Sequence, residues 1–203
     1  MAGKLCVKEL TVGPIGTCCY VVWREGREDC VVIDPGAEPE RIRQSLEGRR
    51  IAAILLTHGH FDHMLAAEEL QKRTGVPVYV HPLDAPMLSD ASLSAYNPEV
   101  SSLPQPGHIA CTAYPESLFG FRVLHNPGHT PGSVCLYHEG EKVLFSGDTL
   151  FRAGFGRTDL AGGSMHQLLS SLRTLLALPR DVRVYPGHGE STTIDEECRR
   201  YRR

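Results

Sequence analysis

The feature that most constrains this chain is a continuous apolar run at residues 51–56, followed at once by a cluster of polar side chains. A run of this kind suits a strand that is buried on both faces, as in a parallel sheet covered by helices. Residues 62–74 have the pattern of a helix, and Gly75 is its expected stop. The polar cluster therefore lies between a buried strand and a helix.

This polar cluster holds four potential metal ligands within six residues. His58 and His60 are two positions apart, a spacing that on a helix would turn their side chains about 200° from each other, so they can face one ion only where the chain is extended or looped. Asp62 and His63 follow at the start of the helix. Two neighbouring ions could divide these four ligands between them. Asp62 alone could instead cap the helix, but four buried polar side chains without a common partner would be costly.

Three further candidate ligands stand in glycine- or proline-rich segments at the expected ends of strands. Each of them alone has an ordinary interpretation as a turn residue. Seven candidates in such places are harder to explain separately, because functional sites gather at strand ends when helices cover the outside of a sheet. The three residues are His129, Asp148 and His188.

The sequence pattern of the rest of the chain predicts strands followed by helices, and this order occurs twice. Two sheets packed back to back, with helices on both outer faces, would bury these elements. Residues 84–118 contain five prolines and no sustained period, and we interpret them as an irregular insertion that could act as a substrate lid. A stripe of apolar residues in the helix at 165–176 is interpreted as core packing. The expected strands are 5–12, 17–24, 29–34, 76–81, 119–125, 133–138, 142–146 and 182–185, with a further helix at 38–47.

Composition limits the class of protein. A chain of 203 residues with a formal charge of −3 fits a single domain over residues 1–203, and it lacks the basic surface that nucleic-acid binding requires. Seven cysteines without a Cys-x-x-Cys pair fit neither a disulfide framework nor a zinc ribbon. No segment has the length of a membrane span. We therefore expect a soluble cytoplasmic protein whose partner is a small-molecule substrate, with no nucleic acid and no membrane; the sequence does not specify its oligomeric state.

The candidate ligands resemble those of the metallo-β-lactamase superfamily, and in particular those of its glyoxalase II-like (hydroxyacylglutathione hydrolase-like) branch. The similarity covers nearly the whole chain and implies an α/β fold, the four-layer αββα sandwich with two mixed sheets. The family's His-x-His-x-Asp-His motif stands here as His58-Gly59-His60-Phe61-Asp62-His63, and the similarity also includes Ile33-Asp34-Pro35-Gly36, Gly156-Arg157-Thr158-Asp159-Leu160 and Pro186-Gly187-His188-Gly189.

The resemblance implies two divalent metal ions per chain. Zinc is the expected metal, and iron and manganese are the alternatives that histidine and carboxylate ligands also suit. By the resemblance, Asp34 supports the metal-binding loops without being a ligand. The implied ligands are His58, His60 and His129 for the first ion, Asp62, His63 and His188 for the second, and Asp148 as a bridge between the two.

The implied activity is hydrolysis of a thioester such as S-lactoylglutathione by a metal-bridging hydroxide, with Asp62 and Asp148 as catalytic residues. Arg152, Arg157 and Tyr96 are candidates for substrate binding. Alternatives are a mononuclear-iron persulfide dioxygenase, a broader lactone or ester hydrolase, and a non-catalytic metal-binding module.

Two differences between this sequence and other members of the superfamily bear on the identity of the substrate. His63 directly after the motif aspartate differs from the commonest class of β-lactamase, which counts against antibiotic hydrolysis. Only fifteen residues follow His188, whereas full-length hydroxyacylglutathione hydrolases carry a C-terminal helical domain that contacts glutathione. The identity of the thiol part is therefore left open.

Overall fold

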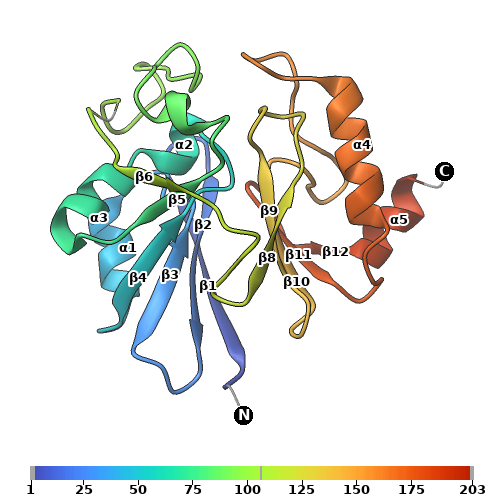
Figure 1. Cartoon of the computed structure of the whole chain (residues 1–203), viewed down its shortest axis with the longest axis horizontal. Helices are drawn as coiled ribbons and strands as arrows, with labels where there is room; N and C mark the ends of the chain where they lie inside the picture. Colours follow the sequence, from blue (N-terminus) through green and yellow to red (C-terminus); the bar gives the residue numbers. More distant parts are fainter. Residues whose placement is uncertain (1–2, 106, 202–203) are drawn as a thin grey trace.

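Two six-stranded sheets pack face to face, and helices cover their outer faces (Figure 1). The structure, a computed structural model, describes residues 3–105 and 107–201; residues 1, 2, 106, 202 and 203 of the expected single domain lie outside the description. The first sheet contains, in spatial order, β1 (Leu5–Val12), β2 (Thr17–Arg24), β3 (Asp29–Ile33), β4 (Arg50–Leu55), β5 (Val78–Val80) and β6 (Cys111–Ala113). The second contains β12 (Thr192–Thr193), β11 (Arg183–Pro186), β10 (Val143–Gly147), β9 (Val134–His138), β8 (Phe121–His125) and β7 (Ser117–Leu118).

Both sheets are mixed. In the first sheet β1, β2 and β3 pair antiparallel, whereas β3, β4, β5 and β6 pair parallel. In the second sheet only β10 and β11, of the described pairs, run parallel. The expected fold class, an α/β four-layer sandwich, is confirmed. The helices are α1 (Pro39–Ser45), α2 (Phe61–Met64), α3 (Ala67–Thr74), α4 (Met165–Leu176) and α5 (Ile194–Tyr201), and η1 (Ala85–Leu88) is a short 3₁₀ turn.

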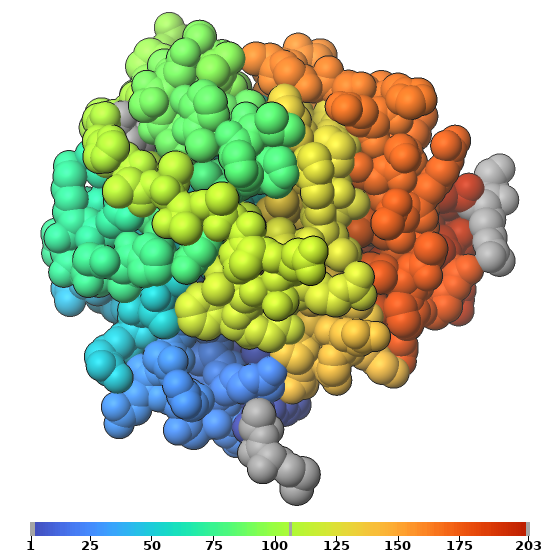
Figure 2. Space-filling view, viewed as in Figure 1, coloured from blue at the N-terminus to red at the C-terminus, as the bar shows by residue number. Residues whose placement is uncertain are grey.

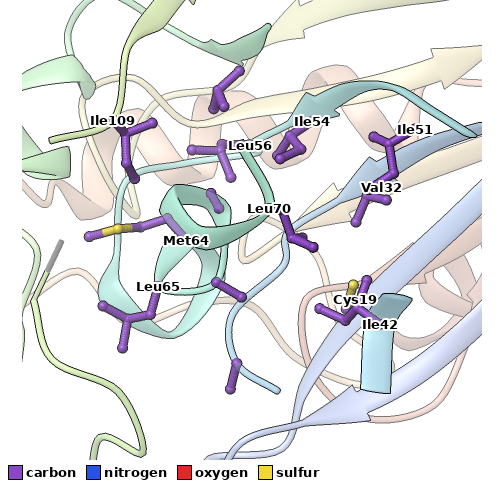
Figure 3. Packing of buried hydrophobic residues seen from close by; sticks show 14 of the residues in the cluster. Cys19, Val32, Ile42, Ile51, Ile54, Leu56, Met64, Leu65, Leu70 and Ile109 are labelled. Carbon is purple, nitrogen blue, oxygen red and sulfur yellow. The ribbon is translucent and has the colours of Figure 1, made fainter. Parts of the chain in front are cut away.

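The alternation of side chains along the strands separates an inner core from two outer cores. On β2, Tyr20 points between the sheets, where its ring lies 5.1 Å from that of Phe145. Its neighbour Val21 points the other way, into a cluster with Ile42 of α1 and Leu70 of α3. Figure 3 shows this outer cluster, in which Ile42 and Leu70 pack against the side chains of the first sheet. Apolar residues on both faces of the central strands thus hold the four layers together.

The helix expected at 62–74 is divided into α2 and α3. The backbone N–H of Ala66 donates to Pro35 O at 3.0 Å, which interrupts the run of helical hydrogen bonds. Gly36 packs so closely that a Cβ atom there would overlap the carbonyl of Asp62. The expected stop is confirmed, because Gly75 is left-handed with φ of 71° and donates to Gln71 O at 2.7 Å.

Two other expectations are corrected in part. Leu168, Leu172 and Leu175 of α4 are buried as expected, but Met165 and Leu169 are 45% and 43% exposed, since the apolar stripe is wider than the face that meets the sheet. The region 84–118 is less irregular than expected, because it contains η1 and β6. The short strand β12 and the helix α5 were not predicted. Within the described residues, no helix is both long and apolar enough to cross a membrane.

Candidate metal centre

The candidate ligands lie in loops at one edge of the sandwich, the upper edge in Figure 1. His58 and His60 follow β4, and the short helix α2 carries the next two candidates of the motif. His129 lies in the loop between β8 and β9, Asp148 directly follows β10, and His188 follows β11. The neighbouring strands β10 and β11 are parallel, so their carboxyl ends deliver Asp148 and His188 to the same edge.

The structure brings all seven candidates together. They form three overlapping groups, in each of which the potential ligand atoms lie within 4.8 Å of one another. In the first group His60 Nδ1 lies 2.8 Å from His129 Nε2. In another, His188 Nε2 lies 3.2 Å from Asp62 Oδ2. The groups are His58, His60 and His129; His58, His63 and Asp148; and Asp62, His63 and His188.

Asp148 lies between His129 on one side and His63 and His188 on the other. Its Oδ1 is 3.4 Å from His63 Nε2, and its Oδ2 is 3.4 Å from His129 Nε2 and 3.6 Å from His188 Nε2. One carboxylate therefore approaches ligand atoms that belong to different groups. This position is compatible with a carboxylate that bridges two ions.

Several atoms of the cluster are buried without a hydrogen-bond partner. They are His58 Nε2, His60 Nε2 and Asp148 Oδ1. Buried polar atoms are nearly always paired, because an unpaired one costs about 1–3 kcal/mol. Histidine nitrogens and carboxylate oxygens are the donors that zinc, iron and manganese accept. The residues present fit metal ions, and the cluster implies that the protein binds them.

Hydrogen bonds hold the Nδ1 atoms of three of the histidines, His58, His63 and His129. His63 Nδ1 donates to Asp34 Oδ2 at 3.0 Å, and His129 Nδ1 donates to the carbonyl of Arg157 at 2.7 Å. His58 Nδ1 lies 3.0 Å from Thr57 Oγ1, whose proton goes to Asp34. Because these contacts occupy Nδ1, the Nε2 atoms of these three histidines face the centre of the cluster. Contacts of this kind orient metal ligands.

Strand β2 supports the part of the site that contains Asp62 and the loop of His188. Thr17 Oγ1, at the start of β2, donates to Asp62 Oδ2 at 2.8 Å. The backbone N–H of Cys18 donates to Gly187 O at 2.7 Å, and the hydroxyl of Tyr20 donates to Pro186 O at 2.6 Å. Strand β2 therefore fixes both Asp62 and the loop that carries His188. Nothing in the sequence pattern distinguished Thr17 from an ordinary strand residue.

Burial and charge set the protonation of the histidines in the metal-free cluster. Burial, together with the neighbouring histidines, lowers the pKa of His60 to about 3 and that of His58 well below its usual value. Burial also opposes the charging of His63, but the carboxylates of Asp62, Asp148 and Asp34 outweigh it and raise its pKa to about 10. His58 and His60 are therefore neutral ligands at pH 7, whereas His63 must release a proton when a metal binds.

A cavity of about 280 Å³ opens onto the cluster. It lies between the loop before β6 and the loop before α4, which Figure 2 shows in green and orange along the upper edge. Apolar residues form much of its wall, and Asn97 and Arg157 add polar groups. Sequence reasoning missed Ile15, Ala95, Asn97 and Val100 of this wall, because these four residues belong to no motif. The lining residues are Ile15, His60, Phe61, Asp62, Ala95, Asn97, Val100, His129, Asp148, Arg157, Leu160 and His188.

The three candidates for substrate binding are placed differently. Arg157 lines the cavity, and its guanidinium pairs with Asp159 at 2.6 Å. Arg152 pairs instead with Glu190. Tyr96 packs its ring 5.9 Å from that of Phe61 and donates its hydroxyl to Leu103 O at 3.3 Å. Of the three candidates for substrate binding, Arg157 is therefore the one found among the described residues that line the cavity.

Comparison with known proteins identifies the family. The family model described as the metallo-beta-lactamase superfamily matches residues 12–188. The chain is 36% identical to the hydroxyacylglutathione hydrolase GloC of Haemophilus influenzae, over 89% of each chain. A crystal structure of TTHA1623 in a di-iron-bound form is 43% identical, with a TM-score of 0.87 over 95% of this chain and 97% of that one. The crystal structure of the B3 metallo-beta-lactamase BLEG-1 is 38% identical, with a TM-score of 0.86 over 96% and 97%. From its motif, its fold and these similarities, the chain belongs to the metallo-β-lactamase superfamily.

Proposed function

We propose that this protein is a hydrolase that holds two divalent metal ions and cleaves a thioester such as S-lactoylglutathione. The observation that carries the proposal is the position of Asp148, whose two oxygens approach His63 on one side and His129 on the other at 3.4 Å. A carboxylate shared by two ligand groups is what a two-metal hydrolytic site requires. The identity to a hydroxyacylglutathione hydrolase supports the thioester substrate.

The residues of the site have separate tasks in this reaction. When bound, a pair of divalent cations supplies Lewis-acid chemistry, because it lowers the pKa of a water to about 7 and polarises a carbonyl. Burial opposes ionisation of Asp62, but the charges of His63 and His188 outweigh it and lower its pKa below the usual value. Asp62 is therefore a carboxylate at neutral pH. It lines the cavity, where it can accept a hydrogen bond from the attacking water and orient it.

The cavity defines which part of the substrate lies inside. About 280 Å³ is at the lower limit of pockets that enclose drug-sized ligands, so it can hold the acyl group and the thioester but not a whole peptide thiol. Ile15 and Val100 are partly exposed at this cavity and offer apolar contacts to the acyl group. Arg157 can meet a carboxylate of the thiol part. We therefore infer that the thiol part extends out of the cavity.

The test is hydrolysis by protein reconstituted with zinc, iron or manganese, measured on S-lactoylglutathione and a simple acyl thioester. We expect turnover of both thioesters and its loss on chelation. Asp148→Asn is expected to lower kcat/KM by more than the about 10–100-fold that follows loss of a residue supporting a ligand, because the shared carboxylate loses its charge. Asp181→Asn is the matched control, because Asp181 is an exposed carboxylate that pairs with Lys142 away from the cavity. Thioester turnover that survives complete removal of metal would contradict the proposal.

The same assay separates the alternatives. A lactone, an oxygen ester and a β-lactam belong in the substrate panel, the last because of the similarity to BLEG-1. Metal content per chain and oxygen uptake with a persulfide test the mononuclear-iron alternative. Turnover of the β-lactam or the persulfide without turnover of any thioester would replace the proposed substrate.

A further inference from the structure

We propose that Asp84 is a positioning residue of the metal centre, because its carboxylate ties the loop of His58 and His60 to the loop of His129. The proposal rests on the metal-binding cluster and not on the thioester substrate. Asp84 lies in the segment interpreted from sequence as an irregular insertion, and no motif drew attention to it.

The carboxylate of Asp84 is completely buried and accepts three hydrogen bonds. Its Oδ2 accepts from the backbone N–H of Gly59 at 3.1 Å and from the hydroxyl of Thr130 at 2.6 Å. Its Oδ1 accepts from the backbone N–H of Gly132 at 2.6 Å. Asp84 forms no ion pair with the described lysines and arginines, so these three donors are the contacts that offset part of the cost of its burial.

Each donor lies close in sequence to a candidate ligand. Gly59 stands between His58 and His60, in the loop that follows β4 of the first sheet. Thr130 directly follows His129, in the loop between β8 and β9 of the second sheet. One side chain therefore connects ligand-bearing loops from the two sheets. A buried carboxylate with three donors is a rigid connection, because hydrogen bonds to a charged acceptor are stronger than those between neutral groups.

The two glycines let this contact form. A Cβ atom on Gly132 would lie 2.6 Å from Asp84 Oδ1, and one on Gly59 would lie 2.9 Å from Asp84 O and 2.6 Å from Met87 Cβ. The turn at Asp84 therefore packs directly against bare backbone in both loops. Its own position is fixed, since the backbone N–H of Asp84 donates to His81 O at 2.9 Å.

This arrangement predicts an effect on one ligand group and not the other. Asp84 sets the distance between His60 and His129, whose ring nitrogens are 2.8 Å apart. The group of Asp62, His63 and His188 is held by other contacts, from Thr17 and Asp34. Loss of the Asp84 contact should therefore weaken metal binding at the three-histidine group alone.

The experiment is titration of the metal-free protein with Co²⁺, followed by its visible absorption. We expect Asp84→Asn to weaken one of two binding steps by about 10–100-fold and to change the absorption spectrum of that step. His129→Gln removes a ligand and so identifies the step that belongs to the three-histidine group. Asp90→Asn is the matched control, because Asp90 is an exposed carboxylate of the same segment that accepts hydrogen bonds from Ser92.

A second variant covers the case in which Asp84→Asn does not fold. Thr130→Val keeps the shape of the side chain and removes one donor to Asp84, and we expect a smaller loss, of about 3–10-fold, in the same step. The proposal is overturned if Asp84→Asn binds Co²⁺ with unchanged affinity and spectrum, or if both steps weaken equally. If Asp84→Asn does not fold, an unchanged titration of Thr130→Val overturns it. None of these readouts requires a thioester, so they are independent of the proposed substrate.

Discussion

Asp34 and His63 form a buried pair in which Nδ1 of the histidine donates to the carboxylate at 3.0 Å. The backbone N–H and the hydroxyl of Thr57 donate to the same carboxylate at 2.8 and 2.7 Å. Asp34 lies directly after β3 with a left-handed φ of 50°, a conformation that aspartate tolerates better than most residues. Because every contact of its carboxylate is with a donor, Asp34 fixes the ring of His63 with Nε2 toward the cluster.

Asp34→Asn is therefore expected to weaken metal binding at the group of Asp62, His63 and His188 by about 10–100-fold. The amide has the shape of the carboxylate, but its NH₂ would face a donor, either Thr57 or His63. Cobalt titration of the metal-free protein measures the loss.

Asp29→Asn is the control, since Asp29 is a carboxylate at the opposite end of β3 that pairs with the exposed Arg27. An Asp34→Asn variant that binds metal as tightly as the parent would show that the His63 contact does not matter for binding.

Gly187 allows its backbone to pack closely against two candidate ligands, Asp148 and His63. A Cβ atom there would overlap Asp148 Oδ1 and lie 2.8 Å from His63 Cε1. Gly187→Ala should therefore displace Asp148 or the His188 loop, and a displacement of about 1 Å can lower the rate about 100-fold. The measurement is kcat/KM together with metal content. Gly154→Ala is the control, since a Cβ atom there meets nothing within 4 Å, and it should retain the parent activity.

Much of the fold was predictable because the strands carry local signals. Strands β1 and β2 were predicted with the observed bounds, since the segments are rich in β-branched, cysteine and aromatic residues and are separated by glycine-containing turns. The metal-binding cluster was predictable for a related reason. Its histidines and aspartates stand in short glycine- and proline-rich segments that directly follow strands, so the sheet alone brings them to one edge.

The rest depends on contacts between distant parts of the chain. Strand β6 pairs with β5, but it is short and its residues are exposed, so its sequence has no periodic pattern of apolar residues. The break between α2 and α3 comes from Pro35, about thirty positions earlier. Thr17 and Asp84 are ordinary residues in the sequence and acquire their roles only through contacts with segments that are distant along the chain. Tertiary contacts of this kind have no signature in local sequence.

Removal of metal is expected to destabilise the folded protein. In the metal-free state His58 Nε2 and Asp148 Oδ1 remain buried without partners, and binding of an ion to the folded state alone stabilises it. At a free metal concentration about 100 times the dissociation constant, the gain in the free energy of unfolding is about 2.7 kcal/mol per ion. Thermal unfolding with a chelator and with excess metal measures the difference. Equal melting temperatures under both conditions would argue against a metal centre in this cluster.

A stacked pair of histidines, neither of them a candidate ligand, joins the two sheets. The rings of His81, which follows β5, and His125, which ends β8, lie 4.1 Å apart and within 12° of parallel. Burial, and then the proximity of His125, lower the pKa of His81. The folded state therefore favours the neutral form of His81.

Because of this pair, the stability of the protein is expected to fall as the pH falls. Because the pKa of His81 is lower in the folded state than the usual value of about 6.5, the unfolded chain binds more protons below that pH. The contribution of neutral His81 to the free energy of unfolding is fully present above about pH 6.5. It is lost as the pH falls through the pKa of His81 in the folded state. His81→Gln should therefore reduce the fall in melting temperature between roughly pH 7 and 5, measured at equal metal content. His166→Gln is the control, because His166 is exposed. If both variants lose stability with acid as steeply as the parent, the stacked pair is not the source of the sensitivity.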